Sequence, residues 1–159
     1  MSRQPLLLIS RKDLVLACDG PDGEHMIRLL AGLTRRGISF VATASQPSEW
    51  SRSKAESKRG RPGPRRLRDR LAEAGGLLDG VYYIPQSLMT QRTRNEEALS
   101  ELLDRFGTEA KDCYLVSTDR ALLATARKMQ VNAVKISEKS DLVAILGDLM
   151  QTLEQENRT

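Results

Sequence analysis

The feature of this 159-residue chain that most constrains its fold is the alternation of short apolar runs with segments of helical periodicity. The apolar runs are typical of buried strands and lie at about residues 13–18, 38–42, 80–84, 112–116 and 131–136. Between them, apolar residues recur at helical spacing, as at Met26 and Leu30 before a predicted helix stop at Gly37. Strands separated by helices form right-handed crossovers. We therefore expect an α/β fold: a three-layer α/β/α sandwich with a mainly parallel, five-stranded sheet (Rossmannoid).

The run at 13–18 is interpreted as the first strand because it stops abruptly at Asp19 and Gly20. Ligands in open α/β folds bind at the carboxyl ends of strands, so Asp19 is a candidate acid/base or metal ligand, or else a helix cap. Thr43 and Ser45 follow the second strand and are candidates for binding an anion, or serve as turn hydroxyls. Residues 5–9 form a further apolar run, which predicts an extra edge strand or one arm of a hairpin.

Composition indicates an ordinary globular chain, expected to form one domain over residues 1–159. Hydrophobic residues make up 40% of the chain and charged residues 29%, while aromatic residues, at 4%, are too few for a nucleic-acid stacking platform. No apolar run approaches the roughly 20 residues that span a bilayer. Residues 6–9 are too short for a signal-peptide core. We expect a cytoplasmic protein without membrane association.

Cysteine and histidine usage argues against a disulfide framework and a conventional zinc site. Cys18 and Cys113 both lie in predicted strands, which favours reduced, buried thiols over catalytic ones. His25 is the chain's single histidine, so the chain lacks the ligands for a zinc site of the usual kind.

The positive charge is concentrated in one segment. The chain has a net charge of +4, but residues 51–70 alone carry +7, which leaves −3 for the rest. Residues 46–66 are rich in Ser, Pro and Gly as well, and are predicted to be a basic loop insertion. This loop either binds an unknown protein partner or is simply solvated. Nucleic acid is a less favoured partner, because the arginines of the following helix spread around its axis. The candidate partner-binding residues are Arg52, Lys54, Lys58, Arg59, Arg61, Arg65 and Arg66.

Several stretches resemble one enzyme superfamily in their order and spacing over residues 13–137. They comprise residues 16–20, 41–43, 78–85, 106–116 and 131–134. The chain resembles the haloacid-dehalogenase (HAD) superfamily, especially its histidinol-phosphate and heptose-bisphosphate phosphatase branch. The resemblance implies a capless HAD-like fold and Mg²⁺-dependent phosphoryl transfer. In that chemistry an aspartate attacks phosphorus, and a second aspartate, two residues later, acts as acid and base.

When the groups that the resemblance implies are mapped onto this sequence, few of the required side chains are present. The nucleophile position is Ala17, which cannot form a phosphoenzyme, while Asp19 retains the acid/base position. Thr43 retains the phosphate-binding hydroxyl. The phosphate-binding lysine maps near Thr93, where Arg92 or Arg94 would be the substitute cation. The two acidic metal ligands map to positions without a carboxylate, Thr118 and Leu122, with Asp119 one place away.

The resemblance therefore predicts a catalytically degenerate phosphatase scaffold, a pseudoenzyme that acts as a binding or regulatory protein. No cofactor is expected, and Mg²⁺ would be needed only by a residual Mg²⁺-dependent phosphatase. The alternative is a ribonuclease, because residues 116–123 also resemble the turn of PIN-like metal-dependent ribonucleases. In that case Asp19, Glu97 and Asp119 would form the carboxylate cluster.

Overall fold

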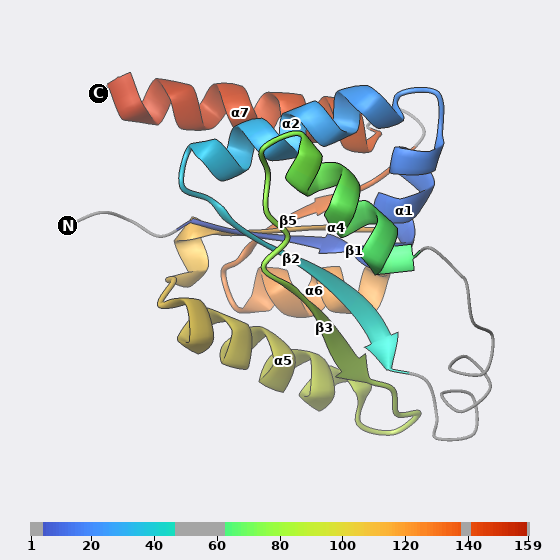
Figure 1. Ribbon diagram of the computed structural model, residues 1–159. Helices are drawn as coiled ribbons and strands as arrows, with labels where there is room; N and C mark the ends of the chain where they lie inside the picture. Colours follow the sequence, from blue (N-terminus) through green and yellow to red (C-terminus); the bar gives the residue numbers. More distant parts are fainter. Residues whose placement is uncertain (1–4, 47–62, 138–140, 159) are drawn as a thin grey trace.

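The protein is described by a computed structural model that covers residues 5–46, 63–137 and 141–158. Its five-stranded sheet is entirely parallel and has the order β3-β2-β1-β4-β5, so the predicted α/β fold class is confirmed (Figure 1). The strands are β1 (Leu6–Ser10), β2 (Ser39–Gln46), β3 (Gly80–Pro85), β4 (Cys113–Ser117) and β5 (Asn132–Lys135).

Helices cover both faces of the sheet, which gives the predicted three layers. One face is covered by α1 (Arg11–Asp19), α2 (Gly23–Arg35), α4 (Gly63–Glu73) and α7 (Leu142–Arg158). The other face is covered by α5 (Gln91–Phe106) and α6 (Arg120–Lys128), with the short 3₁₀ turn η1 (Ala110–Asp112) leading into β4 (Figure 1). The predicted stop of α2 at Gly37 is confirmed, because this glycine has a φ of 89° in the left-handed region.

The prediction for the first strand was wrong. Residues 13–18 belong to helix α1, and the run at 5–9 forms the central strand β1 instead of an edge strand or a hairpin arm. The reason is burial: residues 6–9 are fully buried on both faces of the sheet, as a central parallel strand requires. In α1 only Leu14 and Cys18 are buried, four residues apart, while Leu16 is 65% exposed.

Alternate residues of each strand enter two separate apolar cores. In β1, Leu7 and Ile9 pack toward α1, α2 and α7, whereas Leu6 and Leu8 pack toward α5 and α6. The neighbouring strands follow the same rule, since Leu8 pairs in register with Val41 of β2 and with Leu115 of β4. The register therefore aligns equivalent faces at the carboxyl end of the sheet.

The predicted basic loop lies largely outside the described residues. Arg52, Lys54, Lys58, Arg59 and Arg61 fall in residues 47–62, and Arg65 and Arg66 belong to the first turn of α4. No helix in the described part of the chain is long and apolar enough to cross a membrane.

Candidate functional site

A small polar cavity lies at the carboxyl edge of the sheet, where open α/β folds bind ligands. Its volume is about 30 Å³. Four strands contribute to it: β1 at the centre of the sheet, β2 and β4 on either side of it, and β3 at the edge beyond β2. The described residues that line it are Ser10, Thr43, Ala44, Ser45, Ile84, Gln86, Asn95, Ser117, Asp119 and Leu122.

The cavity arises because the apolar rows of one sheet face end in small hydroxyl residues. Leu6 and Leu8 of β1 belong to the core beneath α5 and α6, and the next residue in that row is Ser10. By the same alternation, Val41 leads to Thr43 in β2, and Leu115 leads to Ser117 in β4. Ser and Thr fill less space than Leu or Ile, so the polar end of this row leaves room above the core.

Asn95 closes the cavity from helix α5, and the sequence analysis missed it. The residue is 2% exposed, and its Oδ1 accepts a hydrogen bond of 2.9 Å from Gln91 Nε2. Its Nδ2 is buried and has no hydrogen-bond partner within the described part of the chain. The signal was present in the sequence, since Asn95 continues the buried helical face of Ala98, Leu99 and Leu102 toward the start of the helix.

Asp119 lines the cavity, but its carboxylate already accepts a hydrogen bond from a backbone N–H. The Asp119 Oδ1 atom accepts a hydrogen bond of 3.1 Å from the Leu122 N–H, which makes Asp119 the N-cap of α6. The Asp119 N–H donates in turn to Ser117 Oγ at 2.9 Å. This carboxylate therefore has a structural role, because it caps the start of α6 where the loop from β4 ends.

A second carboxylate near this edge, Asp13, was also missed because it was taken as the start of a strand. It lies in the first turn of α1 and accepts hydrogen bonds from both donors of Thr118. The Thr118 N–H and Oγ1 each lie 3.1 Å from Asp13 Oδ2. This contact joins the first turn of α1, which follows β1, to the residue that follows β4.

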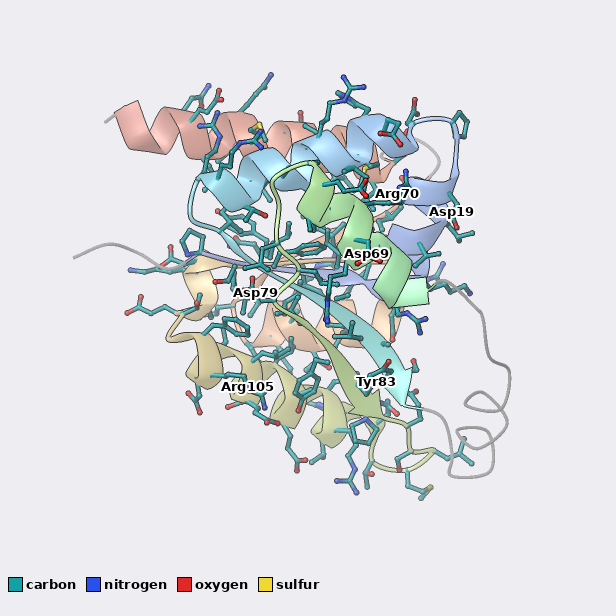
Figure 2. All side chains as sticks on the ribbon, viewed as in Figure 1. Asp19, Asp69, Arg70, Asp79, Tyr83 and Arg105 are labelled. Carbon is teal, nitrogen blue, oxygen red and sulfur yellow. The ribbon has the colours of Figure 1, made fainter. Side chains whose placement is uncertain are left out.

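Asp19 lies away from the cavity. It ends helix α1, its side chain is 58% exposed, and its Oδ1 is 3.7 Å from Arg70 Nη1 of α4 (Figure 2). Arg70 also donates to the Cys18 carbonyl oxygen at 2.9 Å and pairs with Glu24. These contacts fasten the turn between α1 and α2 to α4, so the environment of Asp19 is that of a surface ion pair.

The predicted cations Arg92 and Arg94 are not among the described residues that line the cavity. Both are exposed on α5, where Arg92 pairs with Glu96 at 3.4 Å and Arg94 pairs with Glu97 at 3.7 Å. Thr43 and Ser45 do line the cavity, as their predicted role requires. Within the described lining, no Lys or Arg accompanies them.

The carboxylates of the nuclease alternative do not converge. Asp19 pairs with Arg70, Glu97 pairs with Arg94, and Asp119 caps α6. Among residues 5–46, 63–137 and 141–158, no group of three His, Cys, Asp or Glu side chains is placed to hold a metal ion. Mg²⁺ favours several oxygen ligands anchored by carboxylates. The two carboxylates near this edge, Asp13 and Asp119, already accept hydrogen bonds from the protein, so the described residues fit such an ion poorly.

The two cysteines are reduced and buried, as predicted, although Cys18 lies in a helix and not in a strand. Burial raises the pKa of the Cys18 thiol from 9.0 to about 11, an effect that nearby Arg70 partly opposes. Burial likewise raises the pKa of Cys113 to about 12. Both groups are therefore neutral thiols near pH 7, and neither is an activated nucleophile.

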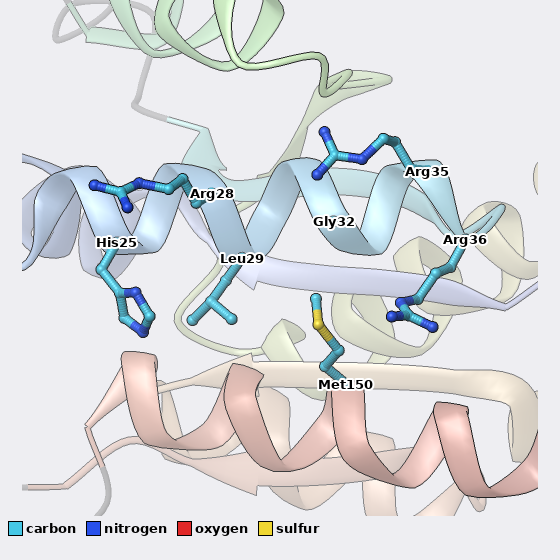
Figure 3. A pocket seen from close by; sticks show the side chains of 7 residues that line it. All are labelled: His25, Arg28, Leu29, Gly32, Arg35, Arg36 and Met150. Atoms are coloured by element: carbon cyan, nitrogen blue, oxygen red, sulfur yellow. The ribbon is translucent and has the colours of Figure 1, made fainter.

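A second, more open cavity of about 450 Å³ lies between α2 and α7. Figure 3 shows Leu29 and Met150 at this helix pair, with His25 among the basic side chains of α2. Its arginines are partly engaged, because Arg36 pairs with Glu154 and Arg35 donates to the Ala74 carbonyl oxygen. The described residues that line this cavity all belong to the helices α2 and α7 or to the residue after α2, so it lies in the helical layer and not at the strand ends.

Comparisons with known proteins bear on the fold. No family model and no curated protein matches the chain. The chain is similar to the structure of a protein from Mesorhizobium loti that is provisionally described as a HAD-like phosphatase, with a TM-score of 0.62 and 18% identity over 98% of this chain and 88% of that one. It is also similar to an uncharacterised protein from Corynebacterium glutamicum, with a TM-score of 0.57 and 18% identity over 91% of this chain and 93% of that one. The chain thus has the α/β fold of HAD-like proteins.

Proposed function

We propose that the protein is a catalytically degenerate HAD-like scaffold that binds a small ligand or a partner and does not hydrolyse phosphate esters. The observation that carries this proposal is the contact between Asp13 and Thr118. Both hydrogen-bond donors of Thr118 bind the one carboxylate near the end of β1. The carboxylate closest in sequence to the end of β1 is therefore hydrogen-bonded to the residue after β4, at the edge of the sheet where a metal ion would need acidic ligands.

The nucleophile position supports the same proposal, although it is not Ala17. Because β1 ends at Ser10, the residue at the strand end is a serine, and the residue two places later is Lys12. The HAD reaction requires an aspartate at each of these positions. A serine hydroxyl is a weak nucleophile unless a base takes its proton. The chain's single histidine, His25, lines the cavity between α2 and α7 and is not among the described residues that line the cavity with Ser10.

The metal-binding positions support it as well. Thr118 and Leu122 occupy the positions where the family has acidic ligands, and Leu122 is a buried member of the core beneath α5 and α6. Leucine contributes no ligand, and Thr118 donates its hydroxyl proton to Asp13. Asp119, one place away, caps α6.

Phosphate release tests this proposal directly. Purified protein is incubated with Mg²⁺ and with p-nitrophenyl phosphate or a sugar bisphosphate, and inorganic phosphate is measured against a blank without protein. We expect no release above the blank at micromolar protein. Mg²⁺-dependent release that is lost in Ser10→Ala but kept in Asp19→Asn would contradict the proposal, because Asp19 lies outside the cavity and provides the matched control.

An interaction role for the basic segment remains a proposal from the sequence. Residues 51–70 carry +7, which is suited to an acidic protein surface. Affinity capture with the intact chain and with a variant lacking residues 51–62 tests it. We expect proteins that bind only the intact chain, and identical sets of captured proteins would count against the role.

A further inference from the structure

We propose that the carboxyl-edge cavity binds an uncharged hydrogen-bonding group of a small molecule, such as a hydroxyl group of a polyol or sugar, through Asn95, Ser10, Thr43 and Ser117. This inference rests on the proposed function, because it names the ligand class of a scaffold that does not hydrolyse phosphate esters. The observation behind it is a buried donor without a partner on a lining residue, Asn95, while the other described lining residues include small hydroxyls and no Lys or Arg.

The donor is Asn95 Nδ2. Asn95 is 98% buried, and its other polar atom is already satisfied by Gln91. Nδ2 has no partner within the described part of the chain, yet the residue lines the cavity. A buried N–H without an acceptor weakens the folded state, and in native proteins such a group commonly marks a bound water or ligand. A molecule inside the cavity can provide the missing acceptor.

The rest of the lining fits an uncharged hydroxyl group. Ser10 and Thr43 offer hydroxyls that donate or accept, and Ser117 adds a third that already accepts from the Asp119 N–H. A ligand hydroxyl can accept from Asn95 Nδ2 and donate to one of these oxygens at the same time. The volume of about 30 Å³ has room for roughly two water-sized groups, about the size of a terminal hydroxymethyl group.

The charge of the lining disfavours a phosphoryl group. The described lining holds the Asp119 carboxylate and no Lys or Arg. Arg92 and Arg94, the cations expected from the sequence, are paired on the exposed part of α5. A phosphoryl dianion would therefore be desolvated beside a carboxylate without a compensating side chain. The N-termini of α1 and α6 contribute only partial positive charge, and Asp119 already occupies the second of them.

Among the described residues, Arg11 is a cation whose participation would change this conclusion. It follows Ser10, and its Nε is buried without a partner among the described residues. It is not among the described residues that line the cavity. Arg11 is therefore the candidate cation of an anion site within the described part of the chain, and its substitution helps to separate the two ligand classes experimentally.

Titration of the full-length, ¹⁵N-labelled chain with glycerol, and separately with inorganic phosphate at constant ionic strength, tests the inference. The reporter is the Asn95 side-chain NH₂ pair, assigned from triple-resonance spectra. We expect glycerol to shift this pair saturably and phosphate to leave it unchanged over the same concentrations. Thr43→Val should weaken glycerol binding at least tenfold. Thr125→Val, which removes a buried hydroxyl of α6 outside the cavity, should change it less than twofold.

Two results would overturn the inference. One is a saturable phosphate shift that disappears in Arg11→Gln, which would make the cavity an anion site. The other is the absence of a saturable shift with both glycerol and D-glucose, which would mean that the cavity holds only water. Failure of the proposed function is detected separately, since phosphate release is measured without reference to glycerol binding. If the Asn95→Leu variant folds, its glycerol affinity is measured in the same way. If it does not fold, Thr43→Val alone provides the test.

Discussion

The two faces of the sheet differ most at the point where the strands end. On the face covered by α1 and α2, the rows of β1, β2 and β4 are apolar at the level where β1 ends, at Ile9, Ala42 and Val116. On the face covered by α5 and α6, the neighbouring residues of the same strands are polar. These are Ser10, Thr43 and Ser117.

This difference separates a face that stabilises the edge of the sheet from a face that leaves a polar cavity there, within one set of strands. Apolar burial contributes about 25 cal/mol for each Å² removed from water, so the face that stays apolar stabilises the edge of the sheet. The other face has small hydroxyl residues there, which leave a polar cavity instead of a filled core. Since adjacent residues point to opposite faces, substitutions one position apart should have effects of different kinds.

The largest effect is expected from a cavity in the larger core. Leu30 of α2 is 1% exposed in the core formed with α1, α4 and α7. Leu30→Ala should lower the free energy of unfolding by about 2–5 kcal/mol, measured by urea denaturation. Ser117→Ala, a change at the polar end of the other face, is the matched control and should cost well under half as much. Equal losses would contradict the separation of the two faces.

The rates at which the two buried thiols react with a labelling reagent compare the two apolar cores, because each core contains one cysteine. Cys18 lies in the core of α1 and Cys113 in the core beneath α5 and α6. Because the pKa of Cys18 is raised from 9.0 to about 11, its thiolate fraction at pH 8 should be about a hundredfold lower than that of a free thiol. We expect slow reaction with Ellman's reagent in the native protein and rapid reaction of both thiols in urea. Up to about pH 11 the native rate should rise with pH. Rapid native labelling at pH 8 would contradict this environment.

The contact between Asp13 and Thr118 should show measurable coupling. Asp13→Ala should lower the free energy of unfolding by about 1–2 kcal/mol, because it removes two hydrogen bonds and a favourable charge in the first turn of α1. Thr118→Ala should cost less, since the backbone N–H remains. A double-mutant cycle isolates the shared part, which we expect to be about 0.5–1 kcal/mol. Additive effects of the two substitutions would mean that the hydroxyl part of the contact contributes nothing.

Much of the fold was predictable from the sequence, because strand and helix periodicities are local properties. The parallel sheet, its two helical layers and the helix stop at Gly37 followed from apolar spacing. The first strand was not assigned correctly, because residues 13–18 and 6–9 are both apolar. Only packing distinguishes them: the shorter run is buried on both faces, and the longer one exposes Leu16.

The site was less predictable because it depends on register between distant strands. Thr43, Ser45 and Asp119 were found, since each comes shortly after an apolar run that predicted a strand, although Thr43 and Ser45 lie within β2 itself. Ser10 and Asp13 were missed as a consequence of the wrong first strand. Asn95 was missed because a single polar residue on an apolar helical face gives no indication of what it faces. Asp19 was chosen for its position after an apolar run, and the helix carries it to Arg70 instead.

Substitutions of Asp119 test whether its carboxylate is a structural helix cap or a ligand of a metal ion. As the N-cap of α6, it should be replaceable by Asn with almost no loss of stability, because Asn accepts the same hydrogen bond from the Leu122 N–H. Asp119→Ala should cost about 1 kcal/mol in urea denaturation. The comparison requires no substrate. A large loss for Asn, or a Mg²⁺-dependent rise in melting temperature that Asn abolishes, would identify a metal-binding role instead.

The smallest effect should come from the cavity hydroxyl itself. Thr43 lines the cavity, whereas Thr125 Oγ1 donates a hydrogen bond of 3.0 Å to the Ala121 carbonyl oxygen within α6. Both residues are buried, so replacing either by valine removes a hydroxyl while nearly conserving volume. Thr43→Val should change the free energy of unfolding by less than about 0.5 kcal/mol, since valine also suits a strand. Thr125→Val should cost about 1 kcal/mol, because it removes a formed hydrogen bond and places a β-branched residue in a helix.

The polar end of the β1, β2 and β4 rows contributes little to folding if this order holds. Its hydroxyls are then available for a ligand, whereas a larger loss for Thr43→Val than for Thr125→Val would mean that they hold the sheet together.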